Sequence, residues 1–331
     1  MRRRLAAALL IAGCAGSSAQ SLERALVTRD VYLMGTRAHL ETYAATRQEG
    51  LASLASALAV LEDAERELST WRDSSEMSAL NRHPVASAWH ANAGLCRMFA
   101  DVWHWHVATG GAFDPAIGRV LAAWDVHGKG TLPRPDVQRR ARAASGLALL
   151  SFDPARCTVT RRGDAAIDVG AFGKGEALDR VEAALGDRPW LIDLGGQVAA
   201  GGPAPEDGWT VGIAEPRRRD HPYMHVRLTE GSLSTSAGSE RDLTVNGIRV
   251  AHIFDPRTGQ PASFTGSVTV WHRRGLAADA LSTALFVMGP EEGLRWAESR
   301  DIAALYLIPE GETVRPAATR AFERFRLSGS E

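Results

Sequence analysis

Residues 168–179 read DVGAFGKGEALD, and this stretch decides how the rest of the chain is expected to fold. An apolar residue and an acid, Ile167 and Asp168, lead into three glycines within six residues, and helical spacing of apolar residues follows. This order predicts the end of a strand, a Gly-rich turn and the start of a helix. Such a turn brings backbone N–H groups close to a ligand, and Lys174 adds a cation. The pattern fits a phosphate cradle or a tight structural turn, since its spacing matches neither a Walker loop nor a dinucleotide fingerprint.

Composition places the chain among ordinary globular proteins. It has 331 residues, of which 45% are hydrophobic and 23% charged, and 38 basic residues balance 39 acidic ones for a net charge of −1. Because the chain has no basic excess and no basic stripe, we expect no nucleic-acid partner. Strand patterns mix with long helical patterns, without a solenoid repeat or a low-complexity linker, which predicts one α+β domain of mixed sheets and flanking helices.

The first residues resemble a targeting signal. Three arginines at 2–4 precede an apolar run at 5–13, which is too short to remain as a membrane-spanning helix. Residues 11–14 read IAGC, which resembles a bacterial lipoprotein signal with Cys14 as the lipidated N-terminus. Ordinary secretion, with cleavage after Ala19, is the alternative. Both interpretations predict an exported, periplasmic protein, and the first adds a lipid anchor in the inner membrane.

The chain is expected to divide into a signal peptide at 1–19, a tether at 20–30 and one domain at 31–325. An exported domain can form disulfides. Cys96 and Cys157 are the cysteines that remain after the signal. The sequence does not decide whether they pair or stay as two small apolar side chains.

Hydrophobic periodicity predicts the main elements. Helices are expected at 47–68, after Ser74 or Ser75, at 94–109, at 117–124, from 176 onward, at 277–286 and at 291–299. Strands are expected at 31–36, 38–43, 147–160, 166–169, 190–198, 209–214, 224–228, 251–259, 267–271 and 302–307, the last of these closing the sheet. Residues 125–140 are expected to be loop-rich, and the small residues at 231–238 to form a turn.

Two side chains near the start of a late helix could bind a hard cation. Asp279 and Thr283 are four positions apart, so their oxygens share one helix face. Mg²⁺ takes few protein ligands and completes its shell with phosphates and water. A helix N-terminal acid beside a threonine that bonds its own backbone would show the same spacing. The pair gains weight only if a phosphate cradle lies opposite, and residues 168–179 could supply it.

Trp71 lies on the connection that follows the helix expected at 47–68. A large ring in such a place fills the core or stacks on a planar ligand. The residues alone favour the core.

Eight short motifs stand in a fixed order along the chain. They are 34–36 (MGT), 69–81 (STW followed by SEMS and Asn81), 111–115 (GAFDP), 168–179, 194–196 (LGG), 235–236 (TS), 252–259 (HIFDPRTG) and 278–284 (ADALSTA). Each motif is weak alone, but their order over about residues 28–310 resembles the ApbE family, the FAD:protein FMN transferases. The resemblance implies an α+β domain, with two lobes around an FAD cleft as a further expectation.

The resemblance implies an activity. Members bind FAD and Mg²⁺ and transfer the FMN moiety to a Thr or Ser hydroxyl of an acceptor protein, releasing AMP. The acceptors are typically flavin-bearing subunits of membrane redox complexes. An FAD pyrophosphatase that passes FMN to water, or a non-catalytic FAD-binding lipoprotein, would use the same motifs.

The resemblance also implies site residues. The expected FAD contacts are Met34, Trp71, Ala112, Phe113, Asp114, Asp168, Lys174 and Ile253. The expected Mg²⁺ ligands are Asp279, Thr283 and the carbonyl oxygen of Ala171. Asp279 is therefore expected to be catalytic, together with His252, which is the candidate for accepting the hydroxyl proton because histidine is a common general base. A strand-end histidine bonded only to structure is the alternative for His252.

Three residues depart from the family's pattern. Ala116 stands where the family often has Thr after Asp-Pro, Gln197 stands where it often has Asp or Asn after the glycine pair, and Glu176 stands where an aromatic residue is common. All three lie beside the expected ligand positions and not on them.

Overall fold

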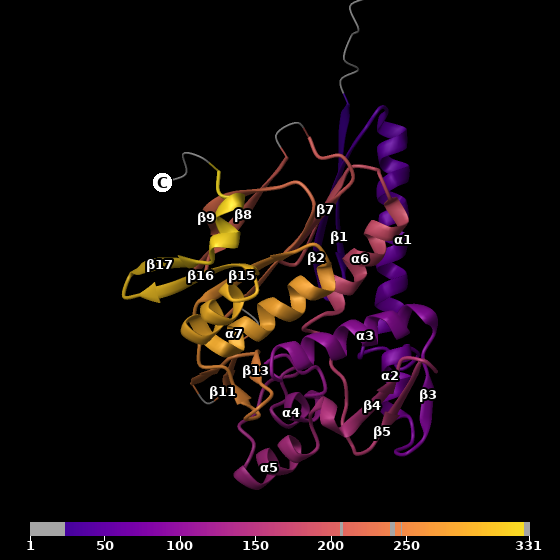
Figure 1. Cartoon of the computed structure of the whole chain (residues 1–331), viewed down its shortest axis with the longest axis vertical. Coiled ribbons are helices and arrows are strands. Elements are labelled where there is room, and N and C mark those ends of the chain that lie inside the picture. The colour runs from indigo at the N-terminus through magenta and orange to yellow at the C-terminus, as the bar shows by residue number, and fades with distance from the viewer. Residues whose placement is uncertain (1–23, 206–207, 239–241, 246, 328–331) are drawn as a thin grey trace, which may run out of the picture.

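A computed structural model describes residues 24–205, 208–238, 242–245 and 247–327 (Figure 1). Its centre is an eight-stranded sheet in which every neighbouring pair is antiparallel, in the order β1-β2-β6-β7-β10-β15-β16-β17. The strands are β1 (Ala25–Leu33), β2 (Thr36–Ala44), β6 (Trp190–Leu194), β7 (Gln197–Gly201), β10 (Gly231–Ala237), β15 (Ser267–His272), β16 (Ala303–Glu310) and β17 (Thr313–Ala318).

Three long helices contact this sheet: α1 (Arg47–Leu68), α6 (Gly173–Leu185) and α7 (Gly275–Glu298). The helix α1 begins at a capping box, in which Thr46 and Glu49 satisfy each other's backbone N–H groups. Leu54, Leu61 and Leu68 are buried in the largest apolar core, as their spacing predicts, and Leu58 packs against it, whereas Leu51 is 44% exposed. A second core lies between the sheet, the hairpin β8–β9 (Trp209–Glu215 and Arg218–Leu228) and the 3₁₀ helix η2 (Arg320–Phe325).

The lower part of the molecule in Figure 1 consists of the remaining helices, a small sheet and two hairpins. They are α2 (Glu76–Arg82), α3 (Ala93–Ala108), α4 (Gly118–Ala123), α5 (Pro135–Ala143), η1 (Leu147–Leu149), the sheet β3-β5-β4 (Ala88–His90, Thr158–Arg161, Leu150–Asp153) and the hairpins β11–β12 (Leu243–Val245, Ile248–Val250) and β13–β14 (Phe254–Asp255, Gln260–Pro261). A disulfide joins Cys96 of α3 to Cys157 beside β5, with 5.3 Å between the Cα atoms. The two cysteines therefore pair, which the sequence leaves open.

The expected α+β class and the helix at 47–68 are confirmed. Several boundaries are wrong. The strand β1 begins at Ala25, inside the expected tether, because it pairs with β2 along its whole length. The segment 231–238 is no turn but a central strand, since its serines pack against α7. Residues 166–169 form no regular strand, because Asn81 takes both backbone groups of Ile167, each at 2.8 Å.

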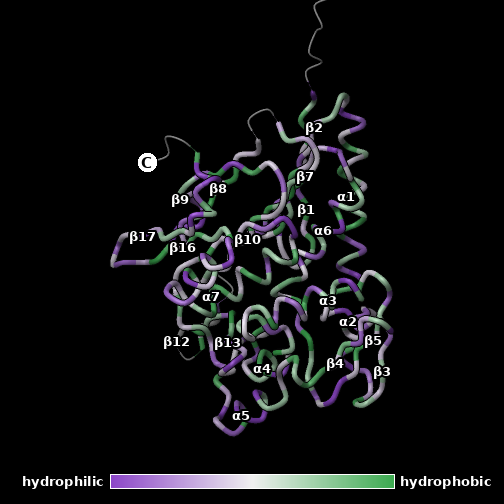
Figure 2. The backbone as a smooth tube through the Cα atoms, in the orientation of Figure 1, coloured by the Kyte–Doolittle hydropathy of each residue, from purple (hydrophilic) through white to green (hydrophobic). Residues whose placement is uncertain are grey.

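Three further expectations, about α5, α7 and the last strand of the sheet, also differ from the structure. The helix α5 forms where a loop is expected, although none of its residues is buried and Figure 2 colours it as hydrophilic. The two helices expected at 277–286 and 291–299 are assigned as one element, α7, kinked at Gly289, whose φ of 73° departs from helical geometry. The strand β17 follows β16 and closes the sheet instead. Within the described ranges, every helix is too short or too polar to span a bilayer.

Candidate active site

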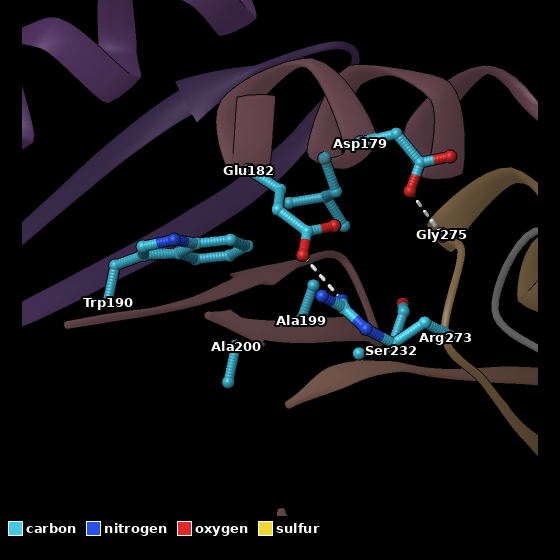
Figure 3. Close-up of a pocket in the computed structure, with 10 residues that line it drawn as sticks. Asp179, Glu182, Trp190, Ala199, Ala200, Ser232, Arg273 and Gly275 are labelled. Atoms are coloured by element: carbon cyan, nitrogen blue, oxygen red, sulfur yellow. Dashed lines mark hydrogen bonds and ion pairs between the residues drawn. The ribbon is translucent and has the colours of Figure 1, made fainter. Parts of the chain in front are cut away.

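The start of α6 and the start of α7 are in direct backbone contact. A Cβ atom on Gly175 would lie 2.2 Å from the carbonyl oxygen of Gly275, so only glycine allows the two helices to approach this closely. Asp179 of α6 then accepts hydrogen bonds from the backbone N–H groups of Gly275, at 2.5 Å, and Leu276, at 3.1 Å. Asp179 therefore caps α7, because the side chain of the N-cap residue of α7, Arg274, makes no capping hydrogen bond. The Gly-rich stretch and the Asp279 helix are thereby held together, and Figure 3 shows the Asp179–Gly275 contact.

Asp279 lies at this junction and is 4% exposed. Its carboxylate oxygens are 3.2 and 3.3 Å from the Nζ of Lys174 and accept from the Gly175 N–H at 3.3 Å. The Oγ of Ser234 donates to the other oxygen at 3.3 Å. The fold therefore brings the expected Lys174 and Asp279 together across the helix junction, and the lysine neutralises a carboxylate that would otherwise be costly to bury.

The expected metal ligands have suitable chemistry for Mg²⁺. Asp279 provides a carboxylate oxygen, Thr283 lies one turn further along the same helix and is half-buried, and Ala171 lies in the turn before α6. All three offer hard oxygen donors, which Mg²⁺ prefers, and a single carboxylate suffices when phosphates complete the shell. No cluster of three or more His, Cys, Asp or Glu side chains occurs in the part of the chain that the structure describes. A cation here therefore fits only as one shared with a phosphate-bearing ligand.

A ring-lined corner surrounds Asp168 at the other end of the Gly-rich stretch. The Oδ2 of Asp168 is 3.0 Å from Nε2 of His127, and its Oδ1 accepts from the Gly170 N–H at 2.8 Å. Trp71 meets His127 edge to face, with 4.6 Å between ring centroids, and is 67% exposed. The interpretation of Trp71 as core is therefore wrong, and its exposed ring is available to a planar ligand. The hydrogen bond to Asp168 raises the pKa of His127 above its ordinary value.

Met34 lies in a strained turn. Met34 and Gly35 connect β1 to β2 with φ values of 49° and 70°, as a two-residue hairpin of type I′ requires. A left-handed conformation costs a residue other than glycine about 1–3 kcal/mol, and such strain concentrates at functional sites. The Gly195–Gly196 turn packs beside it, because a Cβ on Gly195 would lie 2.3 Å from Oγ1 of Thr36. Two of the recognised motifs therefore meet at one end of the sheet.

The side chains of the segment 112–114 are buried. The side chains of Ala112 and Phe113 are 0% and 1% exposed. Asp114 accepts backbone hydrogen bonds from Ala116 and Leu147, both at 2.9 Å. Burial raises the pKa of the Asp114 carboxyl, and the nearby His106 lessens this rise. These side chains are therefore occupied in supporting the loop, which leaves backbone groups as the means of contact with a ligand.

His252 is oriented by an acid that the sequence does not reveal. Its Nδ1 is 2.7 Å from Oδ1 of Asp242, and its backbone N–H donates to the same oxygen at 3.0 Å. A histidine held by a carboxylate in this way has the arrangement of an oriented general base. Ile253 is half-buried and packs against the core cluster that contains Val268 and Phe286.

A cavity of about 270 Å³ opens next to the motif at 69–81. It is lined by Thr70, Asp73, Ser78, Asn81, Arg82, Arg119 and Ala166. Four of these belong to the motif at 69–81, and Ala166 precedes the Gly-rich stretch by two positions. Arg82 and Arg119 each pair with an aspartate, so the cavity is polar and its charge largely balanced.

The three departures have structural partners. Glu176 is buried and bonds Arg180, at 2.8 Å, within α6, and burial raises the pKa of its carboxyl. Gln197 donates to the carbonyl of Gly275 at 2.9 Å, which ties β7 to the start of α7. Ala116 is buried, and its backbone N–H donates to Asp114 while its carbonyl accepts from the Gly146 N–H at 2.8 Å.

Comparison with known proteins gives one consistent result. The model of the ApbE family matches residues 34–306. An FAD:protein FMN transferase of Rhodobacter capsulatus is 29% identical over 94% of this chain, which spans only 60% of that relative's length. The FAD:protein FMN transferase of Treponema pallidum is also 29% identical, over 88% of this chain and 86% of its own.

Solved structures agree with the sequence relatives. The ApbE protein of Thermotoga maritima superimposes with a TM-score of 0.84 and 25% identity, covering 92% of this chain and all of the other. The flavinyl transferase ApbE of Pseudomonas stutzeri gives a TM-score of 0.79 and 28% identity over 91% and 96% of the two chains.

Proposed function

Since this chain belongs to the ApbE family, we propose that it is an FAD:protein FMN transferase, the activity named for its relatives. The observation that carries the proposal is the junction of α6 and α7, where buried Asp279 meets Lys174 at 3.2 Å. The Gly-rich turn supplies backbone N–H groups and a cation beside this carboxylate. Such an arrangement suits the pyrophosphate of a dinucleotide.

The reaction is a phosphoryl transfer with a protein hydroxyl as nucleophile. The acceptor oxygen bonds to the phosphorus of the FMN half of FAD, the bond from that phosphorus to the bridging oxygen breaks, and AMP leaves with that oxygen. The hydroxyl proton passes to a base, and His252 is the candidate because Asp242 orients its ring at 2.7 Å. Positioning and charge neutralisation supply most of the rate in this class of reaction.

Mg²⁺, held by Asp279, Thr283 and the carbonyl oxygen of Ala171, would neutralise charge on the transferred phosphate. Lys174, now paired with Asp279, would bind phosphate oxygens once a metal compensates the carboxylate. The chain's own part is to keep this region dry and rigid. The buried Asp279 and the capped start of α7 serve that end.

We assign the remaining expected contacts to the same FAD site. We assign Met34, in its strained turn, and Ile253 to the flavin side of FAD. Trp71 would offer FAD an aromatic face, and Asp168 would offer it a carboxylate acceptor. Both residues are close in sequence to Thr70 and Ala166, which line the 270 Å³ cavity. The backbone of 112–114 would form part of the lining of the same site.

A direct assay tests the transfer. The purified protein, FAD, Mg²⁺ and a candidate acceptor are mixed, and fluorescent flavin on the acceptor is sought by gel and by intact mass. We expect a mass increase of one FMN on the acceptor, and Asp279→Asn should abolish it. Asp136→Asn, an acid on the hydrophilic helix α5, is the matched control and should leave transfer unchanged.

The same assay separates the rival activities. Free FMN and AMP without a labelled acceptor would replace the proposal with an FAD pyrophosphatase. FAD binding without AMP release would replace it with a passive FAD-binding protein. Transfer that survives in Asp279→Asn would remove Asp279 from the metal site.

We further propose that the protein is exported, with its acceptor a flavin-bearing subunit or domain of a membrane redox complex. The signal at 1–19 supports export, although residues 1–23 lie outside the described structure. The disulfide between Cys96 and Cys157 supports it independently, because such bonds persist in oxidising compartments. Mass spectrometry of the mature N-terminus decides between a lipidated Cys14 and cleavage after Ala19.

A further inference from the structure

A row of hydroxyl groups is buried between β10 and α7. Alternate residues of a strand share one face, and Ser234 and Ser236 of β10 both meet Ser282 of α7, with Oγ–Oγ distances of 3.1 and 2.9 Å. Ser234 also donates to Oδ1 of Asp279 at 3.3 Å. The three serines are at most 8% exposed.

Packing alone does not account for these hydroxyls. Burying a hydroxyl gains nothing unless it is hydrogen-bonded, and alanine would fill nearly the same space on both elements. Serine also has no special preference for the centre of a sheet. On the adjoining strand β15, the residues paired with Ser234 and Ser236 on the same face of the sheet are valines, Val270 and Val268, which pack against α7. The serines are therefore better explained by the Asp279 carboxylate, to which Ser234 is hydrogen-bonded.

The hydrogen atoms can be assigned along the row. Each serine has one hydrogen to donate, and an ionised carboxylate is the strongest acceptor present. Ser234 therefore donates to Asp279, Ser282 donates to Ser234 or to the carbonyl of Asp279 at 3.0 Å, and Ser236 donates to Ser282. With either acceptor for Ser282, the hydrogen of Ser234 points to the Asp279 carboxylate.

We infer that Ser234 and Ser282 are positioning residues that fix the Asp279 carboxylate for cation binding. Ser234 engages Oδ1, so Oδ2 is turned towards the Gly175 N–H and the Gly-rich stretch. Ser282, also bonded to the backbone of Asp279, keeps Ser234 from rotating away. The inference rests on the proposed function, because it concerns the carboxylate assigned to the metal. Removing such an outer partner typically costs about 10- to 100-fold in metal affinity.

The test uses two variants of nearly equal shape in the full chain. Ser234→Val and Ser234→Thr add the same volume to the strand, and only the threonine keeps a hydroxyl. The readout is the affinity for Mn²⁺ in the presence of FAD, measured by calorimetry and by the electron paramagnetic signal of free Mn²⁺. We expect Ser234→Val to weaken Mn²⁺ binding about tenfold relative to Ser234→Thr, and Ser282→Ala to weaken it in the same direction.

A control on the same strand separates positioning from general packing. Thr235 points to the opposite face and bonds Thr269 at 2.8 Å, away from Asp279. Thr235→Val should change the melting temperature without changing Mn²⁺ affinity. Equal Mn²⁺ affinities for Ser234→Val and Ser234→Thr would overturn the inference, as would an equal loss in Thr235→Val.

The readout also distinguishes this inference from the proposed activity. If the wild-type protein fails to label any acceptor but Ser234→Val still binds Mn²⁺ more weakly than Ser234→Thr, the positioning role stands and the transferase proposal falls. If transfer is confirmed and both variants bind Mn²⁺ equally, the transferase stands and the positioning role falls.

Discussion

Replacing Gly175 with alanine should destabilise the protein by forcing α6 away from α7. The added Cβ would lie 2.2 Å from the carbonyl oxygen and 2.6 Å from the next backbone nitrogen at Gly275 and Leu276. Both are backbone atoms, so no side chain can rotate out of the way. Because non-bonded atoms prefer separations near 3.5 Å, the helices would have to separate by roughly 1 Å at this point.

The expected cost follows from two opposing effects. Overfilling a packed interior costs about 1–3 kcal/mol, and contact with backbone places Gly175→Ala at the upper end. Alanine recovers about 1 kcal/mol because its helix propensity is higher than that of glycine. The net loss should therefore be about 2 kcal/mol. The shift would also lengthen the 3.3 Å hydrogen bond from the Gly175 N–H to Asp279, so metal affinity should fall with stability.

Urea unfolding followed by circular dichroism measures this loss. Gly94→Ala is the matched control, because Gly94 also lies in the first turn of a helix, α3, and its added Cβ would meet only a side-chain oxygen at 3.3 Å. The control should be neutral or stabilised by up to about 1 kcal/mol. If Gly175→Ala were as stable as the wild type, close backbone contact would not be what holds the two helices together.

Three further outcomes are expected. Cys96→Ser should lower the free energy of unfolding by about 2–5 kcal/mol, as the loss of a native disulfide typically does, and reducing the wild type should reproduce the change; no change in either would show the bond to be dispensable. Lys174→Gln leaves the buried Asp279 carboxylate without its cation, so the metal-free protein should lose about 3 kcal/mol and Mn²⁺ should restore part of it, whereas a melting curve insensitive to Mn²⁺ would contradict the metal site. The pKa of His127, followed by its imidazole NMR signals, should lie above the ordinary value and fall in Asp168→Asn. Since the folded pKa is raised, the stabilisation from this contact is complete below the ordinary pKa and is lost as pH rises through the raised one; equal values in both proteins would remove the carboxylate as its cause.

Local sequence patterns were sufficient to predict the parts of the site that lie within one helix or one turn. The glycines of 168–179 and the four-residue spacing of Asp279 and Thr283 are readable because a turn and a helix impose them. The ordered motifs then predicted that the two segments meet, and the contact between Lys174 and Asp279 agrees with that. The helix at 47–68 was equally predictable from its leucines.

The contacts that depend on distant segments could not be read in this way. His127 lies in a loop 41 positions before Asp168, and nothing in its neighbours indicates that pairing. Asp242 and His252 are joined around the hairpin β11–β12, whose short strands leave a weak pattern. The serines of β10 look like a turn because small hydroxyl residues favour turns, and only their contact with α7 makes them a strand.

The order of strands in the central sheet has a consequence for how the chain acquires its structure. The strand β2 is hydrogen-bonded to β6, so Ala38 pairs with Leu194, and the intervening chain contains α1 to α6. The first hairpin therefore keeps an open edge until the residues near 194 have been made. Pairings this distant slow folding, and an unpaired strand edge invites association with other chains.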